Sequence, residues 1–211
     1  MKNVDDLIGE AETLADHGLS KGEIADELNV SRDTASWLVE RSGAAPGDDD
    51  AAEVVSSPQD IHVDWSAIGR DSDRLTQIGR AMADLLIKEG QAVDLTVGIE
   101  KAGTPLATTI ARDLETDLAA YAPAKHQWDE GDLDERGGGF SRNFAELRGR
   151  DCYVVDDTIT SGRTMQETVE AIKEQGGNPV ACVVIVDKQG LDAVAGVPVY
   201  SLVTVLGVGP E

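Results

Sequence analysis

Residues Tyr153–Thr164 read YVVDDTITSGRT, and this stretch decides the fold of the larger part of the chain. Val154 and Val155 are apolar and β-branched, as in a buried strand. Asp156 and Asp157 stand where that strand should end, and a turn rich in hydroxyl groups and glycine follows. The next residues, MQETVEAIKEQGG, have the spacing of an amphipathic helix that ends at a pair of glycines.

A strand that runs through a tight polar turn into a helix N-terminus forms an anion pocket, because unpaired backbone N–H groups and the helix dipole point the same way. Two adjacent carboxylates beside such a pocket suit the diol of a sugar, or Mg²⁺ held through water. The pattern therefore predicts a site for a phosphorylated ribose. The plainer alternative is an ordinary strand–turn–helix with an acidic turn. A P-loop is not indicated, since no GK[ST] sequence closes the turn.

This run resembles the signature of type I phosphoribosyltransferases. The resemblance implies that Asp156 and Asp157 hold the 2′- and 3′-hydroxyls of phosphoribosyl pyrophosphate. It also implies that the following turn wraps the 5-phosphate through Thr158, Thr160, Ser161, Gly162, Arg163 and Thr164. Any Mg²⁺ would arrive with the ligand, near the two aspartates, and we expect no direct metal ligands from the protein.

The stretch VGIEKAGTPLATTIA, residues 97–111, resembles the pyrophosphate loop of the same family. We expect a strand to end at Ile99 and a helix to begin near Thr104, with Thr104 as its N-cap and Pro105 in the first helical position. The resemblance, which covers about residues 60–205, implies that pyrophosphate meets Glu100, Lys101, Ala102 and Gly103.

From about residue 59, apolar strand patterns alternate with helical ones. Strands are expected at 61–65, 93–99, 117–122, 152–156, 179–187 and 198–205. Helices are expected at 71–89, 104–114 and 164–175. This alternation predicts an α/β fold, a doubly wound parallel sheet of the type I phosphoribosyltransferase kind, over residues 59–211.

Residues 1–42 show only helical patterns and are predicted to form an all-α helix-turn-helix domain. Ser20 and Glu23 make a capping box at the start of one helix, and Ser31 caps the next after a short break. An earlier helix over about 4–17 completes three helices. The spacing IAxxLxVSxxTAxxxL resembles the helix-turn-helix of many transcription regulators. Residues 43–58, GAAPGDDDAAEVVSSP, have the composition of an acidic linker.

The helix-turn-helix resemblance implies which residues meet double-stranded DNA. The second helix enters the major groove N-terminus first, with Arg32, Asp33 and Ser36 at base edges. The residues expected to contact the phosphate backbone of the DNA are Lys21, Ser31, Thr34 and Arg41. A small dimerisation or packing domain is the alternative, because residues 1–42 hold ten acids and four bases. In molar salt, however, a basic face gains little from counterion release.

The whole chain carries 40 acidic and 18 basic residues, a net charge of −22 over 211 residues. Such a polyanion suits a cytoplasm of molar salt, where the Debye length is about 3 Å and self-repulsion is screened. We therefore expect a halophilic, archaeal protein, the alternative being a generic acidic one. Cys152 and Cys182 have no metal spacing and are expected to be buried, inert thiols of a reducing compartment. No apolar run approaches twenty residues, so a cytoplasmic protein without membrane contact is expected.

The segment 123–150 departs from the catalytic members of the family. Ala122 and Pro123 stand where orotate-type transferases carry a basic pair. Lys125 is the remaining candidate for a catalytic cation, and an acidic run follows it. Gln166 stands where an arginine meets the orotate carboxylate, so orotate is not an expected substrate.

Two functions follow from these patterns. The first is a DNA-binding transcription regulator whose transferase-like domain binds phosphoribosyl pyrophosphate, or a related sugar phosphate or nucleotide, as effector. This arrangement resembles the orotate phosphoribosyltransferase-like regulators of halophilic archaea, which are linked to sugar catabolism. It implies a homodimer, with two reading helices about 34 Å apart. The second is an active purine or pyrimidine phosphoribosyltransferase with an appended helical domain.

Overall fold

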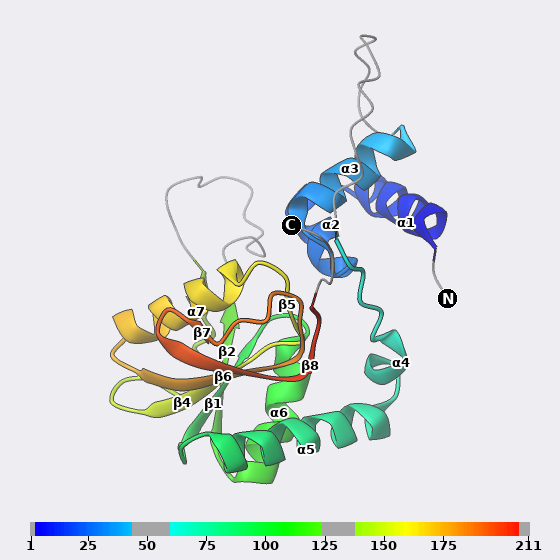
Figure 1. The fold of residues 1–211 in the computed structure, drawn as a ribbon. Coiled ribbons are helices and arrows are strands. Elements are labelled where there is room, and N and C mark those ends of the chain that lie inside the picture. Colours follow the sequence, from blue (N-terminus) through cyan, green and yellow to red (C-terminus); the bar gives the residue numbers. More distant parts are fainter. Residues whose placement is uncertain (1–2, 44–59, 124–137, 207–211) are drawn as a thin grey trace. The chain divides into compact units, whose positions relative to one another are not determined.

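The computed structural model describes residues 3–43, 60–123 and 138–206 (Figure 1). The chain divides into two compact units, Met1–Trp65 and Ser66–Glu211. Residues 44–58 of the predicted linker lie outside the described residues. No helix in the described ranges is both long and apolar enough to cross a membrane.

The smaller unit consists of the three helices that the sequence predicts, α1 (Val4–Asp16), α2 (Lys21–Glu27) and α3 (Arg32–Ser42). Each begins at a polar cap, as helix starts require. The predicted capping box of Ser20 and Glu23 is confirmed at α2, and Ser31 accepts a hydrogen bond from the backbone N–H of Thr34 at α3. The three helices share one apolar core, which includes Leu7, Ala11, Ile24, Leu28, Val30, Ala35 and Leu38.

The strand expected at 61–65 is wrong. Residues 60–65 have no regular structure and lie against the helical unit. The side chain of Asn29 donates to the carbonyl oxygen of Val63 at 3.2 Å, and Asp60 accepts from the N–H of Ser31 at 2.6 Å. An alternating pattern predicts a strand but not its partner, and here the hydrogen bonds are made with Asn29 and with the backbone between α2 and α3 instead of with a neighbouring strand.

The larger unit alternates strands and helices. Its helices are α4 (Ser66–Gly69), α5 (Ser72–Glu89), α6 (Gly103–Leu114) and α7 (Arg163–Glu174). Its strands are β1 (Leu95–Ile99), β2 (Asp117–Ala122), β3 (Gly139–Phe140), β4 (Asp151–Val155), β5 (Thr158–Ile159), β6 (Asn178–Asp187), β7 (Ala193–Val194) and β8 (Val197–Thr204).

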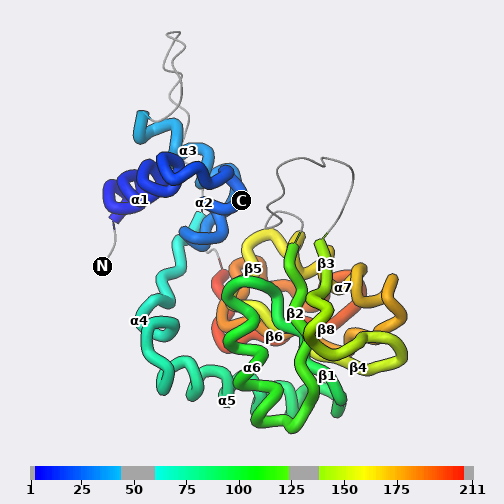
Figure 2. The backbone as a smooth tube through the Cα atoms, turned by 180° about the vertical axis from the view of Figure 1, so that it is seen from behind, coloured from blue at the N-terminus to red at the C-terminus, as the bar shows by residue number. Residues whose placement is uncertain are grey.

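The strands form one sheet in the order β3-β2-β1-β4-β6-β8-β7, with β5 paired to β6. Strands β2, β1, β4, β6 and β8 are parallel, and β3 and β7 add antiparallel edges. Helices α5 and α6 cover one face and α7 the other (Figures 1 and 2). Every residue of β1 is buried, as expected for a strand between two helical layers. The predicted α/β, doubly wound fold is confirmed.

One arginine joins three strands at their amino ends. Arg150, just before β4, lies 2.9 Å from the carboxylate of Asp117 and 3.3 Å from that of Asp94. Its guanidinium also donates to the backbone oxygen of Asp94 at 2.6 Å. The arginine side chain is 22% exposed, whereas the two carboxylates are 67% and 63% exposed. The pairs are therefore partly screened, and the charge-assisted hydrogen bond to the backbone oxygen of Asp94 adds to their stabilisation.

We expect Arg150→Ala to lower the free energy of unfolding by about 1–2 kcal/mol, because charge-assisted hydrogen bonds to two strand ends are lost. Urea denaturation in molar KCl measures this. The control is Lys88→Ala, which breaks an ion pair with Asp84 whose side chains are 66% and 60% exposed. That change should cost less than about 0.5 kcal/mol. Equal losses in the two variants would contradict the role given to Arg150.

Candidate functional site

The two aspartates of the opening motif lie at a step in the sheet. Strand β4 ends at Val155, and the chain then moves sideways to form β5, which pairs with the far end of β6. The carbonyl oxygen of Asp157 accepts from the backbone N–H groups of Ile185 and Val186 at 3.0 and 3.1 Å. The main chain at the step is thus fixed to β6. The side chains of Asp156 and Asp157 are half-buried at the carboxyl edge of the sheet, where ligands of open α/β sheets bind.

The predicted phosphate turn connects β5 to α7. Gly162 has a φ of 76° and is the N-cap of α7, a left-handed conformation that favours glycine. In the described part of the chain no side chain caps this helix start. Ser161 and Arg163 are exposed, and Thr160 and Thr164 are half-buried. The turn therefore carries hydroxyl groups and a guanidinium beside an uncapped helix N-terminus, a combination that suits phosphate.

The second predicted loop lies against the first. A Cβ atom added to Gly103 would lie 2.3 Å from the carbonyl oxygen of Val155 and 2.9 Å from the Cα of Asp156. Only glycine permits this approach. Glu100 donates from its backbone N–H to the carbonyl oxygen of Tyr121 at 2.8 Å, and the Glu100–Lys101 peptide bond is cis. The sequence-predicted residues of the two loops, 100–103 and 156–164, therefore meet at the Gly103–Asp156 contact.

The expected N-cap role of Thr104 is wrong. Helix α6 begins at Gly103, its N-cap is Ala102, and no side-chain cap is formed in the described structure. The hydroxyl of Thr104 is buried and has no hydrogen-bond partner among the described residues. The close approach of the β4 end requires glycine at the first helical position, and this moves the helix start ahead of the residue with the best capping side chain.

A buried carboxylate supports the predicted phosphate turn, and sequence reasoning missed it. Asp187, 2% exposed, accepts from the backbone N–H groups of Gln189, Gly190 and Leu191 at 2.8, 3.0 and 2.6 Å. The turn that it forms places the Leu191 side chain 3.2 Å from the Cβ position of Gly162. The available signal was an acid at the end of an apolar strand followed by a glycine, which is turn chemistry.

A second missed carboxylate joins α7 to strands β2 and β3. Glu167 accepts from the hydroxyl of Tyr121 at 2.8 Å and from the backbone N–H of Gly138 at 3.3 Å. Burial and the carboxylate of Glu167 raise the pKa of Tyr121, so this hydroxyl stays protonated. Phe140 packs on the Tyr121 ring with centroids 4.8 Å apart. Lys125, the candidate catalytic cation, and the acidic run after it lie outside the described residues.

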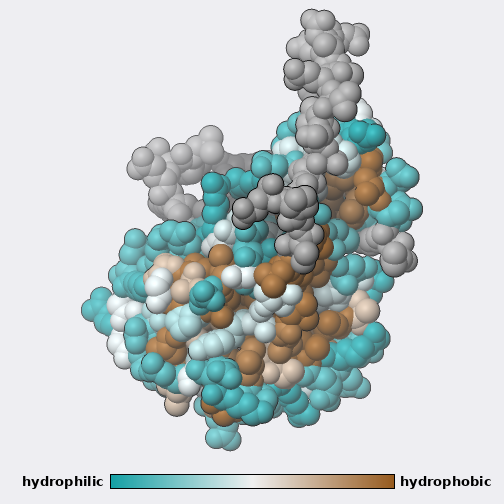
Figure 3. All heavy atoms as spheres, in the orientation of Figure 1, coloured by the Kyte–Doolittle hydropathy of each residue, from teal (hydrophilic) through white to brown (hydrophobic). Residues whose placement is uncertain are grey.

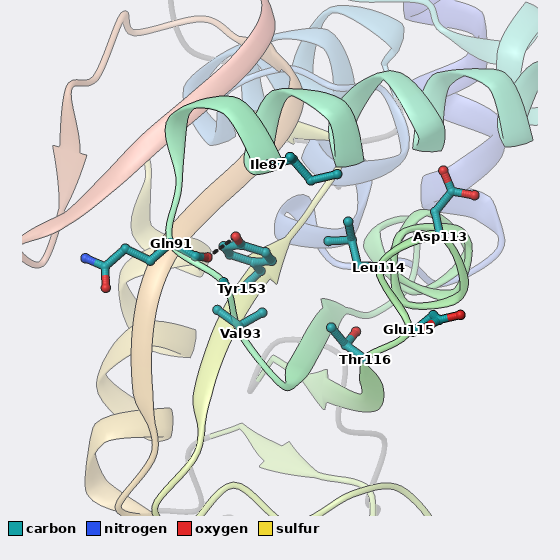
Figure 4. A pocket seen from close by; sticks show the side chains of 9 residues that line it. Ile87, Gln91, Val93, Asp113, Leu114, Glu115, Thr116 and Tyr153 are labelled. Atoms are coloured by element: carbon teal, nitrogen blue, oxygen red, sulfur yellow. Dashed lines mark hydrogen bonds between the residues drawn. The ribbon is translucent and has the colours of Figure 1, made fainter.

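A cavity of about 360 Å³ lies elsewhere on the larger unit (Figure 4). It lies at the amino ends of β1 and β2, where Ile87, Val93, Leu114 and Tyr153 form its apolar part. The Tyr153 hydroxyl donates to the carbonyl oxygen of Gln91. In Figure 4 the acidic side chains on its rim point away from the tyrosine ring. This cavity is therefore at the opposite end of the strands from the aspartate step.

The thiols and potential metal ligands give no competing site. Burial raises the pKa of both Cys152 and Cys182 to about 12, so the thiols are protonated at neutral pH and inert. Their predicted burial is confirmed. Within the ranges that the structure describes, no three or more His, Cys, Asp or Glu side chains are grouped to hold a metal ion.

The predicted DNA-reading residues lie on the outer side of α3. Ala35, Leu38 and Val39 face the core, whereas Arg32 and Asp33 are exposed and Ser36 is half-buried.

Of the predicted phosphate contacts, Lys21 and Arg41 are exposed, whereas Ser31 and Thr34 are less accessible. Ser31 and Thr34 bond to each other through their hydroxyls at 2.9 Å, and Thr34 is only 9% exposed. Lys21 pairs with Glu40 at 3.2 Å, and the Arg41 guanidinium lies 5.2 Å from the centre of the Trp37 ring.

A model of the phosphoribosyl transferase domain matches residues 64–202. The fold agrees with that of adenine phosphoribosyltransferase from Thermoanaerobacter pseudethanolicus, with a TM-score of 0.56 at 17% identity over 73% of this chain and 93% of that one. The chain belongs to the phosphoribosyltransferase domain family, and within it to the family of the transcriptional regulator GfcR. It is 70% identical to GfcR of Haloquadratum walsbyi, covering 100% of this chain and 96% of the relative. Identity to GfcR of Haloferax volcanii is 65%, covering all of both chains.

We expect Gly103→Ala to separate the two loops, because the new methyl group would overlap the Val155 carbonyl oxygen. Binding of phosphoribosyl pyrophosphate, measured calorimetrically in molar KCl, should fall at least tenfold. Unfolding should become easier by about 1–3 kcal/mol. The control is Gly9→Ala in α1, where nothing lies within 4 Å of the added Cβ. Alanine there should leave ligand binding unchanged, and unchanged binding in Gly103→Ala as well would contradict the assigned contact.

Proposed function

We propose that this protein is a DNA-binding transcription regulator whose larger unit binds phosphoribosyl pyrophosphate, or a related sugar phosphate or nucleotide, as effector. The contact of Gly103 with the Asp156 step carries the proposal, because it brings a diol-binding pair and two helix N-termini to one edge of the sheet. The regulated genes that we propose are those of sugar catabolism. Membership of the GfcR family supports regulation rather than metabolism as the role.

The geometry supports each part of the ligand. The carboxylates of Asp156 and Asp157 accept hydrogen bonds, as ribose hydroxyls require. The 5-phosphate would lie at the uncapped N-terminus of α7, among Thr158, Thr160, Ser161, Gly162, Arg163 and Thr164. The loop of Glu100, Lys101, Ala102 and Gly103 would face the pyrophosphate. Mg²⁺ suits the carboxylate oxygens and would enter with the ligand, bound to its phosphates and to water near the two aspartates.

The alternative is an active purine or pyrimidine phosphoribosyltransferase. The larger unit has the fold of such enzymes. Loss of pyrophosphate requires cationic stabilisation of the leaving group, and Ala122 and Pro123 replace the basic pair that orotate-type enzymes place there. Gln166 replaces the arginine that meets the orotate carboxylate. We therefore favour ligand binding without turnover. Base-dependent release of pyrophosphate in molar KCl would support the enzyme instead.

The proposal includes a salt-rich cytoplasm. With a net charge of −22, the chain repels itself in dilute buffer, and salt shortens the range of that repulsion. We expect cooperative unfolding below roughly 0.5 M salt, and full stability in dilute buffer would argue against a halophilic protein.

We also propose a homodimer, since a twofold pair of reading helices matches an inverted repeat in DNA. Apolar residues gather on the face of the larger unit seen in Figure 3, and Val203 and Leu206 are 51% and 72% exposed. Exposed apolar surface of this kind is available for association. Light scattering in molar KCl tests the dimer, and a monomer would contradict it.

The paired change Asp156→Asn with Asp157→Asn should abolish effector binding and leave the fold intact. The amides keep the shape of the carboxylates but replace an acceptor with a donor and remove both charges. Calorimetric titration with phosphoribosyl pyrophosphate, with and without Mg²⁺, measures the loss, and urea denaturation measures the fold. Glu146→Gln, an exposed acid of the same unit, is the control and should bind normally. Loss of folding in the paired variant would show that the aspartates are structural.

Arg32→Ala should weaken binding to operator DNA by about 1–3 kcal/mol and leave effector binding unchanged, because an arginine at a base edge makes a bidentate contact. Fluorescence anisotropy in molar KCl, with a duplex selected from a random pool by the wild-type chain, measures the affinity. Arg70→Ala removes an exposed positive charge from the larger unit and should have little effect. Equal affinities for the two variants would remove Arg32 from the reading surface.

A further inference from the structure

Residues 60–65, here called the clasp, lie on the turn between α2 and α3. Asp60 accepts from the backbone N–H of Ser31 at 2.6 Å, and His62 Nδ1 lies 2.5 Å from the carbonyl oxygen of Leu28. The side-chain amide of Asn29 donates to the carbonyl oxygen of Val63 at 3.2 Å. The clasp thus belongs to the smaller unit, yet the next residue along the chain, Ser66, begins α4 of the larger unit.

Each contact is made to a residue that sets the direction of α3. Leu28 is the C-cap of α2, Asn29 has a φ of 50°, and Ser31 is the N-cap of α3. Three consecutive features of the turn are therefore held from outside the helices. A carboxylate near a helix N-terminus is also favoured by the helix dipole. The clasp consequently fixes the direction of α3 relative to α2.

One polar atom of the clasp is in an unfavourable place. A carbonyl oxygen cannot donate, so the short contact to Leu28 requires the proton on Nδ1 of His62. The other ring nitrogen, Nε2, is buried and has no partner in the described part of the molecule. A buried polar atom without a partner is unfavourable, and release of the clasp would expose it to water. The seated and released states are thereby brought closer in free energy.

We propose that the clasp transmits the state of the transferase-like unit to the reading helix. The proposal rests on the function proposed above, and it names the element through which effector binding reaches DNA. In the seated state Asp60 and His62 hold the turn, and α3 has the geometry that reads DNA. A pull on Ser66 from the larger unit releases these contacts, and the turn loosens.

Hydrogen exchange of the full-length chain in molar KCl tests the clasp. Saturating phosphoribosyl pyrophosphate should change exchange in residues 28–34 of the wild type by at least about fivefold, the lower end of usual coupling between sites. Asp60→Ala should speed exchange in the same residues without ligand, and ligand should no longer change it. Asp60→Asn keeps an acceptor oxygen, so its exchange rate at residues 28–34 should lie between those of the wild type and Asp60→Ala.

The matched control is Glu12→Gln, which removes one exposed carboxylate from the same helical unit. It should exchange and respond as the wild type does. If loss of one negative charge were enough to speed exchange at residues 28–34, Glu12→Gln would speed it as much as Asp60→Asn does. That result would refute the clasp. Calorimetry on Asp60→Ala should still show the wild-type number of effector sites per chain, because the loops 100–103 and 156–164 are intact. The affinity should shift by no more than the coupling itself, since coupling between two sites is reciprocal.

The experiment separates failure of the clasp from failure of the effector. Ligand that binds the wild type but leaves exchange at 28–34 unchanged overturns the clasp and leaves the effector in place. If no heat of binding is detected, the proposed effector is wrong. The role of the clasp is then tested without ligand, by measuring the affinity of each variant for a DNA duplex selected from a random pool. Asp60→Ala should bind at least tenfold more weakly than Glu12→Gln, and equal affinity would overturn it.

Discussion

The structure of the larger unit depends on the contact between two loops at the carboxyl edge of the sheet. Strands β1 and β4 are adjacent and parallel, so the loops that follow them leave the sheet side by side. Gly103 allows the first loop to lie on the backbone of Asp156. The sideways step from β4 to β5 then keeps Asp156 and Asp157 at that edge, because β6 holds the main chain. A parallel sheet thus turns two distant sequence motifs into one site.

The sequence predicts the fold well where a local rule and the tertiary structure agree. The capping box of Ser20 and Glu23 and the apolar run of β4 are confirmed, since each rests on neighbours in the chain. It fails where the partner is remote. The segment 61–65 receives a hydrogen bond from the Asn29 side chain and joins no sheet, and Thr104 loses its capping role to a packing constraint from β4.

Of the candidate site, the sequence predicts the two loops but not the carboxylates that support them. The loops at Asp156 and Gly103 are visible because their residue types are unusual for plain turns. Asp187 and Glu167 are invisible, because a single acid after a strand or on a helix has many uses. Both prove to be supports that accept backbone N–H groups, one behind the phosphate turn and one between α7 and the β2–β3 edge. Only the three-dimensional structure reveals such a role, because it depends on which amides are left without partners.

Backbone chemistry also reconciles a net charge of −22 with the two proposed anionic partners, DNA and a sugar phosphate. Helix N-termini bind phosphate through main-chain N–H groups, which every non-proline residue supplies. Acidic side chains can therefore accumulate on the surface without removing the main-chain N–H groups at the uncapped starts of α6 and α7. In the helical unit, by contrast, the side chains of Ser20 and Ser31 cap the starts of α2 and α3 and already accept from main-chain N–H groups there. The proposed recognition of DNA by this unit would therefore depend on Arg32 at a base edge and on the direction of α3, which the proposed clasp would fix.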